Sequence, residues 1–357
     1  MSPRGVRVAV DAMGGDHGPG EIVPGALDHA RAHPEDQVLL VGDPARIRDS
    51  AGGALPPNVE IVPASQVIEM DEHPALALRE KRDSSITVGC DLVKSGRADA
   101  IVTAGHTGAA MAAAVLRIGR LAGVDRPALA VQMVREGRPF VLLDIGANPD
   151  STAENLLQYA RMGAIFAERV VGVPSPRVAL LSIGEEKGKG DARIQRATEL
   201  LDASDLRFVG NVEGKDLVAD HADVVVTDAV AGNVVIKFFE GLSTFIFDLW
   251  SAEFHRGIRG PLAAFLMKPG IDRIRDVFDY EQAGGSPLLG VRGSVIITHG
   301  LAKRRMIAFG CEVAATQARQ RVPELIAEAL AAEREHAASS ESPPSPTAST
   351  PSAGPVG

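Results

Sequence analysis

Short apolar runs alternate along this chain with segments of helical periodicity, and glycine-rich turns connect them. The first apolar run covers residues 6–11, and the turn after it contains Gly14, Gly15, Asp16 and His17. Pro19 and Glu21 then begin a predicted helix, because proline and an acidic side chain are favourable where the first helical amides lack partners. A strand that enters a helix through glycines directs backbone N–H groups at whatever lies above them. This turn therefore predicts an anion site, most often one for phosphate.

The same order of strand, glycine-rich turn and helix recurs four more times. The later strands are predicted at 100–103, 140–144, 178–182 and 223–227, and further apolar runs lie at 38–41, 59–62 and 129–134. The turns contain Gly105, His106, Thr107 and Gly108, then Gly146 and Asn148, then Lys187, and finally Asn233. Near-continuous apolar strands that alternate with helices are typical of a parallel sheet covered on both faces. We therefore predict a doubly wound, mainly parallel α/β fold with all five turns at one edge of the sheet, where such folds bind ligands.

Residues 234–282 differ from the rest, because nine of the fourteen aromatic residues lie there. Apolar residues recur at helical spacing up to Leu249, and Pro261 starts a second helical segment after two glycines. This pattern predicts a protruding helical hairpin with a hydrophobic tip. Packing in a core or a dimer interface is one interpretation. An exposed patch that meets a membrane or an acyl chain is the other.

The composition, with 45% hydrophobic and 23% charged residues, is that of an ordinary soluble globular protein. We predict a catalytic domain over residues 1–331. From about residue 332 the chain is rich in Ser, Pro, Ala and Thr, which predicts a disordered tail over 332–357. The net charge of −9 does not favour nucleic acid as a partner.

Targeting signals and metal motifs are weak in this sequence. The N-terminus lacks the apolar core of a signal peptide, and no uncharged apolar run reaches the ~18 residues that would span a bilayer, so we expect a cytoplasmic protein. The two cysteines form no disulfide framework and no metal cluster. In the turn at 184–190, three residues separate Gly184 from Gly188, one fewer than a nucleotide-binding P-loop requires.

Seven segments of the chain occur in the same order in the PlsX family of phosphate acyltransferases, which the chain resembles over residues 6–310. They lie at 10–16, 104–109, 144–148, 182–186, 210–214, 232–241 and 284–300. The family usually has asparagine where this chain has His106. Such a resemblance implies an enzyme that makes acyl phosphate from an acyl-acyl carrier protein and inorganic phosphate, for phospholipid synthesis.

The resemblance also implies partners and a fold. The partners are an acyl carrier protein that carries a fatty acyl chain, a second copy of the chain in a homodimer, and the glycerol-3-phosphate acyltransferase that uses the product. Peripheral association with the membrane is implied as well. The implied fold is related to phosphate acetyltransferases and to isocitrate- and isopropylmalate-type dehydrogenases.

We expect phosphate to attack the thioester carbonyl directly, because phosphate is partly dianionic near neutral pH and a thiolate with a pKa near ~8.5 leaves readily. The protein then has to position phosphate and stabilise the oxyanion with fixed donors, and no cofactor or metal is expected. The expected catalytic residues are Asp16, His17, His106, Asn148 and Lys187, with Lys187 as the neutralising charge. The expected phosphate contacts are Gly14, Gly15, Gly105, Thr107, Gly108 and Gly146. Residues expected to support the substrate or the loops are Asn211, Asn233 and His299.

Three other functions fit parts of the pattern. A coenzyme A-dependent phosphate acetyl- or butyryltransferase would use the same fold and chemistry. A metal- and NAD-dependent dehydrogenase is disfavoured, because Arg273 and Arg275 lie among the carboxylates Asp272 and Asp276 that would hold the metal. A non-enzymatic module that binds phosphate or lipid is the third. For an acidic carrier protein we expect a basic patch near the hairpin, formed by Arg256, Arg259, Lys268, Arg273 and Arg275.

Overall fold

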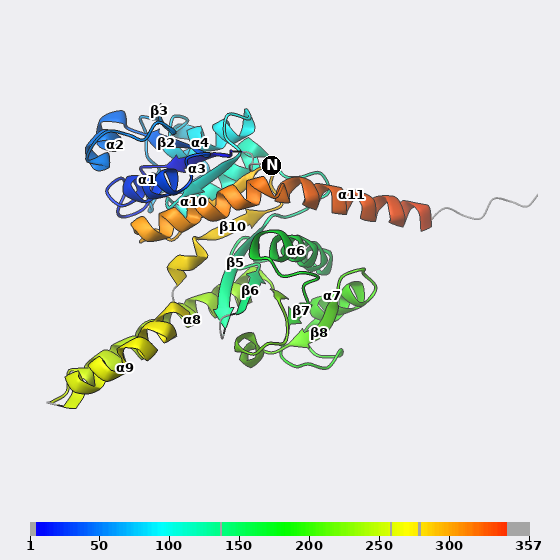
Figure 1. The fold of residues 1–357 in the computed structure, drawn as a ribbon. Helices are drawn as coiled ribbons and strands as arrows, with labels where there is room; N and C mark the ends of the chain where they lie inside the picture. Colours follow the sequence, from blue (N-terminus) through cyan, green and yellow to red (C-terminus); the bar gives the residue numbers. More distant parts are fainter. Residues whose placement is uncertain (1–4, 136–137, 258, 278–279, 341–357) are drawn as a thin grey trace, which may run out of the picture.

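A computed structural model describes residues 5–135, 138–257, 259–277 and 280–340 of the chain (Figure 1). Its centre is an eleven-stranded sheet with the strand order β3-β2-β1-β4-β11-β10-β5-β6-β9-β7-β8. The strands are β1 (Arg7–Asp11), β2 (Gln37–Gly42), β3 (Val59–Pro63), β4 (Ala100–Thr103), β5 (Ala128–Arg135), β6 (Arg138–Leu143), β7 (Val178–Leu181), β8 (Phe208–Val212), β9 (Val224–Val226), β10 (Ser286–Leu289) and β11 (Ser294–Ile297).

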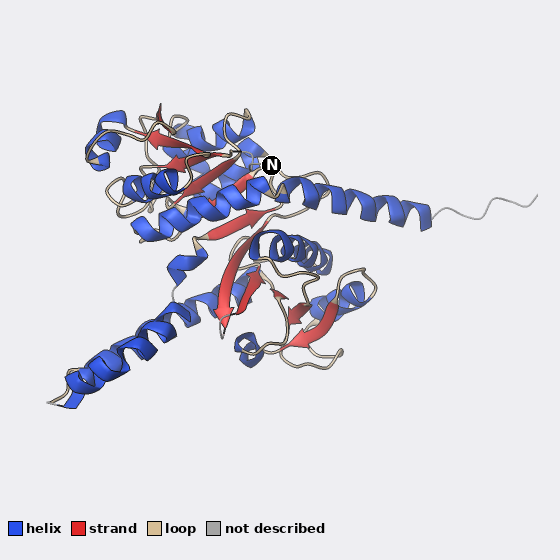
Figure 2. Ribbon diagram, viewed as in Figure 1, coloured by secondary structure: helices blue, strands red, loops and turns tan. Residues whose placement is uncertain are grey.

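The sheet has two parallel halves that run in opposite directions. Strands β1 to β4 and β11 are parallel to one another, and so are β6 to β9. Between the halves, β11 with β10, β10 with β5, and β5 with β6 are all antiparallel, so the direction reverses. Figure 2 shows the strands of the two halves as separate groups joined through β5 and β10.

This reversal corrects one prediction. The turns after β1 and β4 lie at one end of the strands, whereas the turns after β6, β7 and β9 lie at the opposite end. The apolar runs at 38–41, 59–62 and 129–134 do form β2, β3 and β5. Local apolar patterning specifies that a segment is a strand, but strand direction depends on which neighbours it pairs with. Strand β10 is antiparallel to both β11 and β5, so β5 runs in the direction of the first half, and the antiparallel pairing of β5 with β6 then reverses the sheet.

Helices cover both faces of the sheet, as a doubly wound fold requires. They are α1 (Ile22–Ala32), α2 (Pro44–Ala51), α3 (Pro74–Glu80), α4 (Ser85–Lys94), α5 (Thr107–Ala113), α6 (Ala153–Phe166), α7 (Ala192–Asp202), α8 (Ala229–Phe254), α9 (Arg259–Val277), α10 (Arg304–Arg319) and α11 (Val322–Ser340), with single helical turns at Ala114–Ile118, Ala167–Val171, Gly214–Val218 and Tyr280–Ala283. Strand β1 shows the alternation that this requires. Val8 and Val10 are buried in the core that contains α1 and α10, whereas Ala9 is buried with residues of α4 and α5.

The predicted hairpin is present as helices α8 and α9, which extend away from the body as one arm (Figure 1). Helix α8 is long and apolar enough to cross a membrane by length and composition, and 6% of its most apolar stretch is buried. Lys237, Glu240 and Asp248 lie along the same helix.

The predicted boundary at residue 332 is wrong, because helix α11 continues through it to Ser340. Val322, Ile326 and Leu330 are buried one helical turn apart against α6, which anchors the start of α11 on the body. Alanine and glutamate dominate the rest of the helix, and both are strong helix formers. The remainder of the predicted tail, 341–357, lies outside the described residues.

Candidate active site

Asp11, at the end of β1, organises the glycine-rich turns of the first half of the sheet. Its side chain is fully buried. Oδ1 accepts hydrogen bonds from the amides of Met13 and Gly14 at 3.2 and 3.1 Å, and Oδ2 accepts one from the Thr103 hydroxyl at 2.7 Å. Burial raises the pKa of Asp11, and these hydrogen bonds oppose that rise. One carboxyl group therefore joins the turn after β1 to the end of β4.

Three turns lie in direct backbone contact around this carboxyl. A Cβ atom on Gly14 would lie 2.6 Å from the amide nitrogen of Gly105, and one on Gly15 would lie 2.8 Å from the carbonyl of Gly300. The amide of Asp16 donates to the same carbonyl at 2.9 Å. Only glycine allows backbones to approach this closely. Gly14 and Gly15 therefore let the turns after β1, β4 and β11 pack together.

Three of the amides that were expected to bind phosphate already donate within the protein. Gly14 donates to Asp11, Gly105 donates to the Thr103 hydroxyl at 3.0 Å, and Gly108 donates to His106 at 3.1 Å. These three N–H groups are therefore satisfied inside the protein, and a phosphate site at these turns stays a prediction.

Asp144 has the same role in the second half of the sheet. It is fully buried just after β6, and burial raises its pKa. Its carboxylate accepts hydrogen bonds from the amides of Gly146 at 3.1 Å and Asn148 at 2.8 Å. The side-chain Nδ2 of Asn148 donates to Asp144 Oδ2 and to the carbonyl of Pro127. Asn148 is therefore a buried loop support, and its amide donors do not face a substrate.

His106 caps helix α5. Its ring nitrogen Nδ1 accepts from the amides of Gly108 and Ala109 at 3.1 and 3.4 Å. An asparagine side chain commonly accepts the same bonds at a helix N-cap. Histidine can thus replace the family's usual asparagine as an acceptor at the helix N-terminus, whereas the sequence analysis predicted a catalytic role for His106.

A cavity of about 860 Å³ lies between helix α8 and strand β5 and reaches the turns of both halves of the sheet. Its apolar wall includes Leu129, Val131, Met133, Ile145, Ile236, Phe239, Phe247 and Ile297. Its polar wall includes Thr107, Gln132, Gly146, Asn233, Lys237, Glu240, Gln282, Ser286, Thr298, His299 and Arg305. This size and mixture of surfaces are typical of a site for a small molecule.

Helix α8 can pass close to the Asp144 turn because residue 232 is glycine. A Cβ atom there would lie 2.0 Å from the carbonyl oxygen of Asp144. This contact places Asn233 and Gly146 on the same cavity wall. The amino end of α8 is itself capped by Asp228, which accepts from the amides of Val230 and Ala231.

Comparison with known proteins identifies the family. A family model described as "Fatty acid synthesis protein" matches residues 6–325. A phosphate acyltransferase of Desulfitobacterium hafniense (strain DSM 10664 / DCB-2) is 47% identical over 311 residues, covering 87% of this chain and 93% of that one. A phosphate acyltransferase of Nostoc punctiforme is 46% identical over 308 residues, covering 84% of this chain and 89% of that one. The chain belongs to the phosphate acyltransferase family.

Solved structures show the same fold at low sequence identity. A phosphotransacetylase from Streptococcus pyogenes matches with a TM-score of 0.61 and 19% identity, over 88% of this chain and 94% of that one. The EutD phosphotransacetylase from Staphylococcus aureus matches with a TM-score of 0.60 and 17% identity, over 89% and 95% of the two chains. The phosphate acyltransferase described here is an enzyme of fatty acid and phospholipid synthesis on the family match, and it shares an α/β fold with phosphotransacetylases.

Four of the site residues predicted for this phosphate acyltransferase line the cavity, namely Thr107, Gly146, Asn233 and His299. The others lie elsewhere. Lys187 is 76% exposed and pairs with Asp202 at 2.5 Å. Asn211 is buried under α7, where Oδ1 accepts from the Thr198 hydroxyl at 3.2 Å. Asp16 and His17 are exposed, and no hydrogen bond joins their side chains among the described residues.

Two cations on the cavity wall of the phosphate acyltransferase escaped sequence analysis. Lys237 on α8 lies 2.8 Å from Glu240, and Arg305 on α10 lies 3.6 Å from Glu281 with its guanidinium over the Phe309 ring. Lys237 is the one lysine within the apolar run 234–250, and a lone cation in such a run could have marked it as a candidate site residue. The sequence around Arg305 contains no such indication, because Arg305 lies on the cavity wall only as a result of how α10 packs.

Proposed function

We propose that this enzyme transfers a fatty acyl group from an acyl carrier protein to inorganic phosphate, and that the reaction takes place in the cavity between α8 and β5. The cavity carries the proposal, because its wall combines a long apolar surface with polar groups and two cations. An acyl chain buries its methylene groups favourably against such a wall, by about 0.8 kcal/mol for each one. The polar groups lie where a thioester and a phosphate ion would need partners.

The proposed reaction is a single acyl transfer. A phosphate oxygen attacks the thioester carbonyl carbon and forms a new C–O bond, and the C–S bond then breaks. The electron pair leaves with sulfur as the carrier's pantetheine thiolate, which takes a proton from solvent. The enzyme's contribution is to position the two reactants and to stabilise the negative charge that develops on the carbonyl oxygen.

Donors for this step come from the polar wall of the cavity. The Thr107 hydroxyl and the Asn233 amide are on that wall and are exposed to it. Lys237 takes the neutralising role that the sequence had suggested for Lys187, because Lys237 lines the cavity and Lys187 does not. Arg305 supplies a second positive charge at the amino end of α10.

The exposed apolar face of α8 supports a homodimer. Val230, Val234, Phe238, Leu242, Phe245 and Leu249 are all exposed and recur at three- or four-residue spacing. Spacing of this kind places them on one side of the helix. An apolar stripe this long is unusual on a monomer, so we infer that a second copy of the chain covers it.

The tip of the arm supports contact with a membrane. Leu262, Phe265, Leu266 and Met267 are exposed on α9, between 55% and 75%. Arg259 and Arg273 are exposed on the same helix, while the side chain of Arg275 lies outside the described residues. Exposed apolar side chains with nearby arginines suit the surface of an anionic bilayer. The same arginines form a candidate docking patch for an acidic carrier protein.

A coenzyme A-dependent phosphate acyltransferase is the second candidate, because the fold matches phosphotransacetylases. A fold alone does not distinguish a carrier-bound thioester from a free one. Steady-state kinetics with the same fatty acyl group on acyl carrier protein and on coenzyme A tests the proposal. We expect kcat/KM to be higher for the carrier-bound thioester. Equal or higher kcat/KM for the coenzyme A thioester would refute the carrier assignment and leave phosphate acyl transfer in place.

A further inference from the structure

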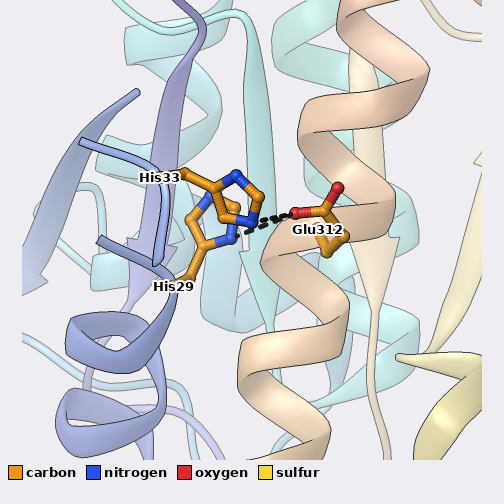
Figure 3. A group of neighbouring side chains, drawn as sticks. All are labelled: His29, His33 and Glu312. Atoms are coloured by element: carbon orange, nitrogen blue, oxygen red, sulfur yellow. Dashed lines mark ion pairs between the residues drawn. The ribbon is translucent and has the colours of Figure 1, made fainter. Parts of the chain in front are cut away.

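Two histidines and a glutamate meet between helices α1 and α10 (Figure 3). Glu312 Oε2 lies 3.6 Å from His29 Nδ1 and 2.8 Å from His33 Nε2. The imidazole rings are 4.7 Å apart and tilted by 31°. None of these three residues lines the cavity, so the phosphate transfer described above does not use them.

The cluster lacks a full set of hydrogen bonds. The side chain of His29 is 1% exposed, and in the described part of the chain neither His29 Nε2 nor Glu312 Oε2 has a hydrogen-bond partner. A buried polar atom without a hydrogen-bond partner is costly. His29 Nε2 faces Asp36, whereas Glu312 Oε2 faces both imidazoles, so a cation bound between them would satisfy Oε2.

A carboxylate lies behind each of the two histidines, and a hydroxyl group holds the glutamate. The second nitrogen of His29 lies 3.4 Å from Asp36 Oδ2, and the second nitrogen of His33 lies 3.5 Å from Glu35 Oε1. Glu312 Oε1 accepts a hydrogen bond from the Thr316 hydroxyl at 3.3 Å. A carboxylate behind a histidine orients the ring that faces a metal ion.

Charge also favours a cation at this position. Glu312, Glu35 and Asp36 contribute three negative charges around two histidines, whereas Arg319 contributes one positive charge by pairing with Asp36. Two nitrogens and one carboxylate oxygen are ligands that Zn²⁺ prefers. Tetrahedral coordination separates ligand atoms by about 3.3 Å, and the two measured separations lie on either side of that value.

We propose that His29, His33 and Glu312 bind a divalent transition-metal ion of the Zn²⁺ type, which joins α1 to α10. Water completes the fourth position. The role is structural, since the ion would connect the first helix of the chain to one of its last, and none of its three ligands lines the cavity. The proposal does not depend on which acyl donor the enzyme uses.

Zn²⁺ itself is the probe for the test. Untagged full-length protein is freed of metal with a chelator, and Zn²⁺ binding is measured by calorimetry together with the thermal midpoint. We expect one Zn²⁺ bound per chain and a higher midpoint for the wild type, and neither for His33→Ala or Glu312→Gln. The positioning variant Glu35→Gln should weaken Zn²⁺ binding by about tenfold. His221→Ala, which removes an exposed histidine elsewhere, is the control and should bind like the wild type.

A second readout guards against variants that fail to fold. Co²⁺ in a tetrahedral site of nitrogen and oxygen ligands gives visible absorption, which should appear for wild type and His221→Ala and be absent for His33→Ala. The metal-free His33→Ala protein should keep the circular dichroism of the metal-free wild type. Unchanged Zn²⁺ affinity in His33→Ala and Glu312→Gln, or no binding by the wild type, would overturn the proposal. Acyl transfer is expected to survive chelation, so loss of metal and loss of the enzymatic function remain distinguishable.

Discussion

Buried carboxylates at strand ends explain much of the site at the scale of single residues. Asp11 and Asp144 each follow an apolar strand and each accept hydrogen bonds from the turn that comes next. The glycines of those turns were predicted to present amides to phosphate, and in this structure they let neighbouring turns of the protein's own backbone approach closely. The sequence alone could not show whether these glycines contact a phosphate ion or a neighbouring turn, because both need the same glycine-rich sequence.

Lys237 and Lys187 give a matched pair of substitutions at the residue scale. Lys237→Met should lower kcat/KM by about 10- to 100-fold, because a hydrogen bond to a charged group is worth about 1.5–3 kcal/mol. Lys187→Met should leave kcat/KM near the wild-type value, since Lys187 pairs with Asp202 at the surface. Steady-state kinetics with phosphate varied provides the measurement. A larger loss for Lys187→Met than for Lys237→Met would contradict this assignment.

His106 offers a test of helix capping. His106→Ala removes the acceptor for the amides of Gly108 and Ala109, which should lower the free energy of unfolding by about 1 kcal/mol. His106→Asn keeps an acceptor and should be as stable as the wild type. Denaturant unfolding of the three proteins measures the difference. Equal stability of all three would show that the ring does not cap α5.

At the scale of elements, the sequence predicted the alternation of strands and helices and the hairpin. It did not predict the reversal of the sheet, because the apolar runs identify β5 and β6 as strands without showing that the two pair antiparallel. It also placed the tail boundary too early, since alanine-rich composition fits both a disordered segment and the helix that forms here.

The α8 stripe predicts how the chain assembles. Phe238→Glu with Leu242→Glu places two charges in the proposed dimer interface and should convert dimers to monomers, because buried unpaired charges are costly. Light scattering after size exclusion measures the mass. Leu116→Glu, at a residue that is 69% exposed outside the stripe, is the control and should remain dimeric. A wild-type protein that is already monomeric would remove the basis for this interface.

The exposed apolar side chains at the tip of α9 predict membrane binding that does not depend on dimer formation. Phe265→Ser with Leu266→Ser removes two of the most exposed apolar side chains and should reduce sedimentation with anionic phospholipid vesicles. The dimer should persist, because the α8 stripe is unchanged. Leu116→Ser should sediment like the wild type. If the tip variant sediments as much as the wild type, the membrane contact lies elsewhere.

At the scale of the whole molecule, both halves of the sheet contribute residues to the wall of the cavity. Thr107 and Thr298 come from one half, and Gly146 and Asn233 come from the other. Sequence analysis predicted four of the cavity's residues through the turns that contain them. It could not predict that the turn with Lys187 lies outside the cavity, since that depends on the position of β7 two strands beyond β6.

The most direct test of the whole account is the dependence of acyl phosphate formation on phosphate. The full-length enzyme is mixed with a fatty acyl-acyl carrier protein and hydroxylamine, with and without inorganic phosphate, and acyl hydroxamate is measured. Hydroxylamine traps acyl phosphate, so the account predicts hydroxamate and free carrier thiol in equal amounts only when phosphate is present. Hydroxamate that forms at the same rate without phosphate would contradict direct transfer of the acyl group to phosphate.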